Sequence, residues 1–165
     1  MQNILGLALI AAVILGIQLG TRYLRTRRLQ RWFQRGMTAY KAQSYPEALG
    51  AFRNCIRIAP EWLYARTLMG MCLAHTGRKA EALREIELVE ALQPKEAETW
   101  TLISTFFMVC MPENEERLFE ALDRLASMDI KAARLLVGQP FFRKHMDSPR
   151  LVALKKQLAT ADQEL

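Results

Sequence analysis

The sequence predicts an all-α protein with a single N-terminal transmembrane helix, a short helix–turn–helix solenoid and a C-terminal capping helix. Three observations carry this prediction. Residues 4–17 are apolar without interruption. Residues after this stretch match one another at a separation of 34 positions, which is typical of arrays of helix pairs. Leucines recur at helical spacing after Pro149, at the end of the chain.

Residues 1–20 are predicted to form the membrane anchor. The apolar run extends to Gly20 if Gln18 is accepted, and seventeen helical residues span about 26 Å, the short end of what a bilayer core requires. A cleaved signal peptide is the alternative. It is disfavoured because no charged side chain precedes residue 22 and no small-residue cleavage site follows the run.

Arginines follow the predicted anchor on one side only. They lie in a basic helix, residues 21–35, that is expected to continue into the first repeat: Arg22, Arg25, Arg27, Arg28, Arg31 and Arg35. By the positive-inside rule the N-terminus lies outside and the rest of this single-pass protein is cytoplasmic, with a bacterial inner membrane favoured. The same arginines can form a collar for anionic lipid. RNA binding ranks last, because Trp32 and Phe33 are expected to belong to the first repeat.

Small residues recur every four positions in the predicted anchor and therefore share one helix face: Ala8, Ala12, Gly16 and Gly20. Such a face lets a second transmembrane helix approach closely, and Gln18 can add a hydrogen bond between the helices. The alternative is that the pattern arises by chance, since alanine and glycine are common in membrane spans.

Charge and cysteine content restrict the possible functions. The net charge is +6, but residues 22–41 hold seven basic residues, and the remaining 16 Lys/Arg are matched by 17 Asp/Glu. A nucleic-acid-binding surface over the whole domain is therefore not expected. Cys55, Cys72 and Cys110 form no C-x-x-C motif. Their odd number favours reduced, buried thiols and a cytosol-facing domain.

The repeat is visible in pairs of residues 34 positions apart. Gly36 matches Gly70, Glu47-Ala48-Leu49 matches Glu81-Ala82-Leu83, and Pro60 matches Pro94. Phe52 likewise matches Ile86, and Trp32 and Trp100 lie two periods apart. These residues resemble the pattern of the tetratricopeptide repeat (TPR) family. The resemblance implies repeats at 29–62 and 63–96, a degenerate third repeat at 97–130 and capping helices at 131–165.

The resemblance also implies a concave groove lined by the first helix of each repeat. The equivalent residues are mostly apolar or aromatic: Phe33, Met37, Tyr40, Lys41, Tyr64, Thr67, Met71, His75, Thr101, Thr105 and Met108. A hydrophobic extended peptide or an amphipathic helix suits this lining. A clamp for a peptide carboxylate is disfavoured, because Lys41 is its only Lys or Arg and it holds no Asn. The alternative is that the C-terminal helix of the chain itself fills the groove.

The sequence shows no catalytic constellation, no metal-ligand spacing and no phosphate-binding loop. Cys72 and His75 share a helix face, so His75 can in principle activate the Cys72 thiol as a nucleophile. The favoured interpretation is a core cysteine beside a groove or surface histidine. No cofactor is therefore expected, and the chain is not expected to be an enzyme.

The predicted function is that of a membrane-anchored TPR adaptor. It would hold a protein partner at the cytoplasmic membrane face, in the assembly or stabilisation of a membrane complex. Two alternatives remain open. The first is a structural subunit docked through its transmembrane helix. The second is a peptide-binding import or targeting receptor, because the order of anchor, basic segment and repeats resembles mitochondrial import receptors.

Overall fold

The computed structural model describes the backbone of residues 2–145 and 148–160, and the side chains of residues 14–143 and 148–160. The described residues form helices and connecting turns, with no strand among them. The chain divides into two compact units, Met1–Glu61 (unit 1) and Trp62–Leu165 (unit 2). This boundary falls where the first repeat is predicted to end.

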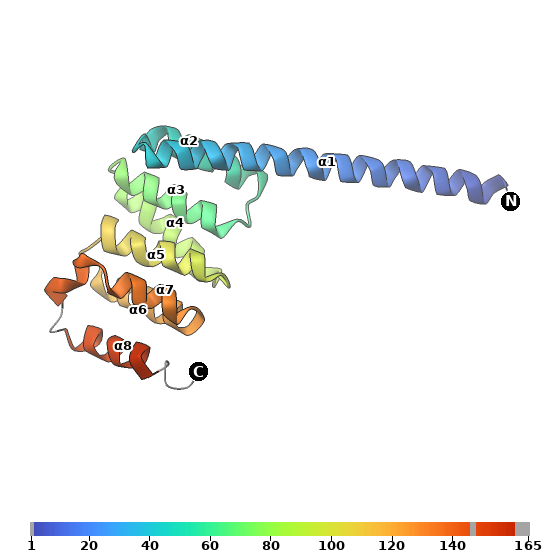
Figure 1. The fold of residues 1–165 in the computed structure, drawn as a ribbon. Helices are drawn as coiled ribbons and strands as arrows, with labels where there is room; N and C mark the ends of the chain where they lie inside the picture. Colours follow the sequence, from blue (N-terminus) through green and yellow to red (C-terminus); the bar gives the residue numbers. More distant parts are fainter. Residues whose placement is uncertain (1, 146–147, 161–165) are drawn as a thin grey trace. The chain divides into compact units, whose positions relative to one another are not determined.

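Unit 1 is a hairpin of two helices, α1 (Gln2–Lys41) and α2 (Tyr45–Ile58), which lie side by side (Figure 1). The two helices approach closely at Gly36, where a β-carbon would lie 2.7 Å from Phe52 Cε1. Ala48 and Phe52 are fully buried on α2. Helix α2 begins directly after Ser44 and has Pro46 in its first turn, and the Ser44 side chain forms no capping hydrogen bond.

Unit 2 begins with two further hairpins: α3 (Leu63–His75) with α4 (Lys79–Ala91), and α5 (Ala97–Cys110) with α6 (Glu115–Met128) (Figure 1). A β-carbon at Gly70 would lie 3.1 Å from Ile86 Cδ1. Gly70 and Ile86 are thus in contact as Gly36 and Phe52 are in the first hairpin. Ser104 occupies the next equivalent position and is fully buried. Helices α5 and α6 both lie within the range 97–130 that is predicted for the third repeat.

The C-terminal part of unit 2 contains α7 (Ile130–Val137), the 3₁₀ helix η1 (Pro140–His145) and α8 (Pro149–Thr160). The Asp129 carboxylate accepts a hydrogen bond of 2.9 Å from the Ala132 amide and so caps α7. Helix α8 packs against α6 and α7, and Leu151, Leu154 and Leu158 are buried. Helices α7 and α8 lie almost entirely within the range 131–165 that is predicted for the capping helices, and the leucines after Pro149 lie on α8.

The structure contradicts the predicted transmembrane helix. In the part of the chain whose side chains are described, no helix is long and apolar enough to cross a membrane. The part of the predicted anchor before Ile14 lies outside the residues whose side chains the structure describes. Arginines follow on the same continuous helix. The predicted anchor, the single-pass topology with the N-terminus outside and the bacterial inner membrane location are therefore wrong.

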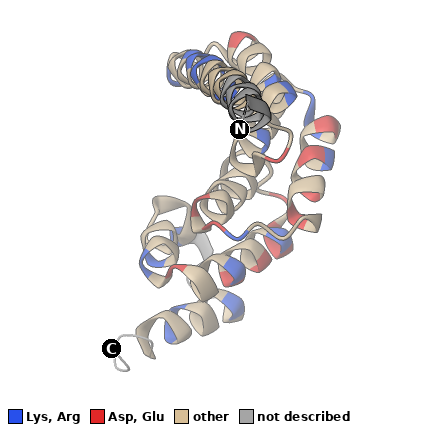
Figure 2. Cartoon of the chain, turned by 90° about the vertical axis from the view of Figure 1, so that its right-hand side faces the viewer, with Lys and Arg blue, Asp and Glu red and all other residues tan. Residues whose placement is uncertain are grey.

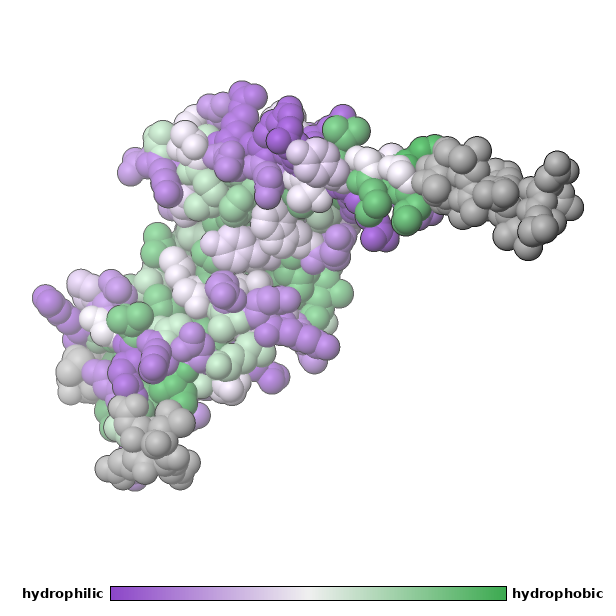
Figure 3. Space-filling view, turned by 45° about the vertical axis from the view of Figure 1, so that its right-hand side comes forward, coloured by the Kyte–Doolittle hydropathy of each residue, from purple (hydrophilic) through white to green (hydrophobic). Residues whose placement is uncertain are grey.

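The predicted small-residue packing face is only partly described. Ala8 and Ala12 lie outside the residues whose side chains the structure describes. A β-carbon at Gly16 or Gly20 would have no atom within 4 Å. The apolar side chains of α1 near Gln18 are exposed, and Figure 3 shows them in green beside the grey segment. No described residue packs against Gly16 or Gly20.

Candidate functional site

The groove residues predicted in unit 1 lie on the last turns of α1. Phe33, Met37 and Tyr40 are half-buried, and Lys41 is exposed. The Phe33 ring lies 6.1 Å from the Phe52 ring of α2, and Tyr40 lies edge-on to Tyr45 at 5.7 Å. These aromatic contacts belong to the α1–α2 hairpin, so the Phe33 ring contributes to its packing.

The groove residues predicted in unit 2 lie on α3 and α5, which pack against each other. Thr67 and Met71 are buried and contribute almost no accessible surface. Val109 is 53% exposed although the sequence pattern did not select it. We use the term α3–α5 surface for the accessible residues, which are Tyr64, His75, Thr101, Thr105, Met108 and Val109.

The threonines of the α3–α5 surface use their hydroxyl groups within their own helix. Thr101 Oγ1 donates to the Ala97 carbonyl at 2.9 Å, and Thr105 Oγ1 donates to the Thr101 carbonyl at 2.7 Å. Because these hydroxyls are already hydrogen-bonded, the polarity of the surface is lower than its composition suggests. The α3–α5 surface therefore suits apolar contacts.

The thiols near His75 are unsuited to nucleophilic catalysis. His75 Nε2 lies 3.7 Å from Cys110 Sγ. Burial raises the pKa of Cys110 to about 11, and burial followed by the neighbouring Cys110 raises the pKa of Cys72 to about 12. Burial also lowers the pKa of His75. Neutral thiols beside a neutral imidazole fit the predicted core role, and all three cysteines are free and buried as predicted.

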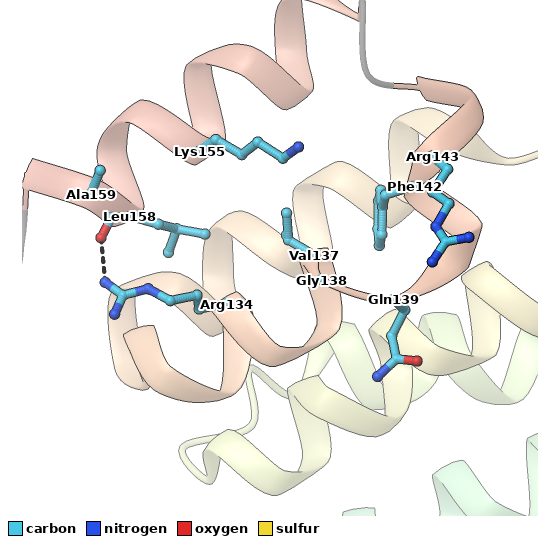
Figure 4. A pocket seen from close by; sticks show the side chains of 9 residues that line it. All are labelled: Arg134, Val137, Gly138, Gln139, Phe142, Arg143, Lys155, Leu158 and Ala159. Atoms are coloured by element: carbon cyan, nitrogen blue, oxygen red, sulfur yellow. Dashed lines mark hydrogen bonds between the residues drawn. The ribbon is translucent and has the colours of Figure 1, made fainter.

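A cavity of about 480 Å³ lies between α7, η1 and α8, where the sequence suggested only a cap. Figure 4 shows Val137, Phe142 and Leu158 along its apolar side, with Arg134 at one end and Arg143 at the other. Arg134 Nη2 donates to the Leu158 carbonyl at 2.6 Å. The remaining lining residues are Gly138, Gln139, Lys155 and Ala159. This lining suits an anionic group attached to an apolar chain.

Arginines of α1 hold this helix to α2. Arg25 Nε donates to the Ile58 carbonyl at 3.0 Å, at the C-terminal end of α2. Arg35 donates from Nε and Nη2 to Glu47 Oε1 at 3.0 and 2.9 Å. Part of the basic segment predicted as an anionic-lipid collar therefore stabilises the hairpin.

Opposite charges gather around Arg117 on α6, and Figure 2 shows acidic and basic positions mixed along the helices of unit 2. The Arg117 guanidinium forms an ion pair with Glu90 and lies 3.6 Å from Glu87 and 4.0 Å from Glu120. Burial raises the pKa of the Glu90 carboxyl, and Arg117 opposes this shift. Arg117 thus offsets the repulsion among three carboxylates that join α4 to α6.

Replacing Arg117 with methionine is expected to lower the free energy of unfolding by about 1–3 kcal/mol at neutral pH, less than for a fully buried pair because water screens the site. Without Arg117 the folded-state pKa of Glu90 rises further, so protonation favours the folded state of the variant. The loss should be largest above that pKa and should shrink as the pH falls below it. Urea unfolding of both proteins at several pH values measures this loss of stability. Arg124→Met, on an exposed arginine of the same helix, is the matched control, and equal, pH-independent losses would contradict the expectation.

Comparison with known proteins finds no family model that matches the chain and no curated protein that is significantly similar to it.

Proposed function

We propose that this protein is a helical-repeat interaction module of tetratricopeptide type that binds a partner protein through an apolar peptide segment or helix. Repeated hairpins support the scaffold part of this proposal. Gly36 contacts Phe52 and Gly70 contacts Ile86 at positions 34 residues apart, and Ala48 and Ala82 are both fully buried. A regular stack of helix pairs offers its first helices as a binding surface.

The observation that carries the proposal is the α3–α5 surface. Tyr64, Met108 and Val109 present an aromatic ring, a thioether and a branched aliphatic group on two adjacent first helices. The hydroxyl groups of Thr101 and Thr105 already donate hydrogen bonds to carbonyl oxygens of their own helix. Aromatic and Met side chains are enriched where proteins bind one another, and Met adapts its shape to different partners.

Selection from a random peptide display library, with the full chain as bait, tests this function. We expect the selected peptides to be apolar and to bind in solution as synthetic peptides. Tyr64→Ala combined with Met108→Ser should weaken binding by about 2 kcal/mol or more, roughly 30-fold, because truncated anchors in an interface centre have such costs. Titration with a fluorescent peptide measures the change.

Leu135→Ser is the matched control, because Leu135 lies on α7 outside the α3–α5 surface and is 73% exposed. It should leave the affinity unchanged. Failure to select any peptide would contradict the proposal. Selection of acidic peptides whose binding requires Arg143 but not Tyr64 would move the site to the C-terminal cavity.

A further inference from the structure

Trp32 does not occupy the core position that the repeat pattern assigns to it. The neighbouring Phe33 supplies the ring that packs on Phe52. Trp32 is half-buried and lies on a different side of α1, because successive residues of a helix are about 100° apart. Part of its indole is therefore left at the surface of unit 1.

Two cavities of unit 1 share Trp32 and Arg28. The larger, about 540 Å³, lies between α1 and α2, and it is also lined by Asn54, Arg57 and Ile58. The smaller, about 330 Å³, is also lined by Arg31 and Arg35 on α1. No acidic residue lines either one. We use the term Trp32 cleft for the two cavities together.

Positive charge in the Trp32 cleft is only partly neutralised. Arg35 is paired with Glu47, and its guanidinium carbon lies 5.7 Å from the centre of the Trp32 ring. Arg57 donates to the amide oxygen of Asn54, a neutral group. Arg28, Arg31 and Arg57 form no ion pair with any residue whose side chain the structure describes. Three guanidinium groups therefore remain to attract an anion beside an aromatic ring.

This combination of groups has a specific chemical meaning. Proteins that bind single-stranded nucleic acid place bases on aromatic rings and run the phosphates along a basic groove. Guanidinium groups match phosphate oxygens through paired hydrogen bonds. We propose that the Trp32 cleft binds a nucleotide unit of single-stranded nucleic acid, with the base stacked on Trp32 and the phosphate held by Arg28, Arg31 and Arg57. This inference goes beyond the proposed peptide binding and uses a different part of the chain.

The partly exposed ring of Trp32 favours a nucleotide over the other anions that arginines attract. A lipid headgroup or an acidic peptide can also neutralise Arg28 and Arg31, whereas every unit of a single-stranded nucleic acid carries both an anion and a planar ring that can stack on the indole. Asn54 also lines the larger cavity. Its Nδ2 donates to the Gly50 carbonyl at 3.1 Å, and the second hydrogen of this amide group can bond a base edge. The ring, the amide and the arginines together therefore fit a base and its phosphate.

Binding of fluorescently labelled oligouridylate and oligodeoxythymidylate to the full chain tests the proposal. Trp32→Ala should weaken binding roughly 5- to 150-fold, the range for one base stacked on an aromatic ring. Trp32→Phe should retain most of the affinity because it keeps a stacking surface. The two oligonucleotides distinguish RNA from DNA as the ligand. Tighter binding of oligouridylate would assign the cleft to RNA, and equal binding of both would assign it to single strands of either kind.

The arginines are tested by the salt dependence of binding. Arg57→Gln should reduce the slope of log affinity against log salt by about 0.7, the value for one phosphate contact in a single strand. Arg53→Gln is the matched control, because Arg53 is exposed on the same helix and lines neither cavity. It should change the slope far less.

Three results would overturn the inference. The first is oligonucleotide binding that Trp32→Ala leaves unchanged in a variant whose circular dichroism is that of the wild type. The second is an equal effect of Arg53→Gln and Arg57→Gln. The third is Trp32-dependent binding to vesicles of phosphatidylcholine and phosphatidylserine without binding to either oligonucleotide, which would assign the cleft to an anionic lipid surface.

Discussion

Phe52→Ala is expected to lower the free energy of unfolding of unit 1 by about 3–5 kcal/mol, the cost of removing a fully buried phenylalanine. The Phe52 side chain is 0% exposed, its ring faces Phe33, and it fills the space that Gly36 leaves open on α1. The void left by alanine cannot be filled by Gly36, which has no side chain. Urea unfolding of the full chain, followed by circular dichroism, measures the loss.

Arg53→Ala, at the next position of α2, is the matched control for Phe52→Ala. Arg53 is exposed, so its replacement should change stability by no more than about 0.5 kcal/mol. If Phe52→Ala were as small in effect as Arg53→Ala, the Gly36–Phe52 contact would not hold the hairpin together.

Ala82→Trp is expected to destabilise the α3–α4 hairpin by about 1–3 kcal/mol or more, because it forces a large ring into a closed helix crossing. Ala82 is 0% exposed, and a β-carbon at Gly70 would lie 3.6 Å from the Ala82 carbonyl oxygen. The backbones of α3 and α4 are therefore too close to admit an indole. The measurement is the midpoint of thermal unfolding.

Ala80→Trp provides the comparison on the same helix, because Ala80 is exposed and an indole there meets only solvent. It should leave the midpoint nearly unchanged. An Ala82→Trp variant as stable as the Ala80→Trp variant would show that the repeat register is wrong.

The hairpins could be predicted because their determinants are local and repeated. Glycine at positions 36 and 70 marks a close approach, the motif around Ala48 and Ala82 marks the facing helix, and the period of 34 aligns the two pairs. The helices that begin at Tyr45 and Pro149 each have a proline within the first two residues. Proline is tolerated in the first turn of a helix, because no hydrogen bond is lost there, and it therefore marks such starts in a sequence.

The membrane prediction failed because it rested on the composition of one apolar run. The helix that contains this run continues without a break to Lys41, and no helix among the described residues is long and apolar enough to cross a membrane. An apolar run therefore does not identify the environment of the helix by itself.

The candidate sites were harder to predict because they depend on which side of each helix packs against the neighbouring helix and which side is left accessible. Trp32 and Phe33 are adjacent aromatic residues, and the repeat pattern assigns the tryptophan to packing, whereas Phe33 makes the contact with Phe52. Thr67 and Met71 follow the expected spacing for the groove but are buried. The C-terminal cavity combines residues of three elements that no short motif joins.

The position of a bound peptide tests the central claim most directly. A photoreactive benzophenone amino acid placed at Thr105, which lies on the α3–α5 surface, should cross-link to a peptide selected by the full chain. The same group at Leu135, which is exposed on α7, should not. Mass spectrometry of the cross-linked product identifies the attachment site. Cross-linking from Thr105 alone is the predicted result, and cross-linking from Leu135 with none from Thr105 would contradict the assignment of peptide binding to α3 and α5.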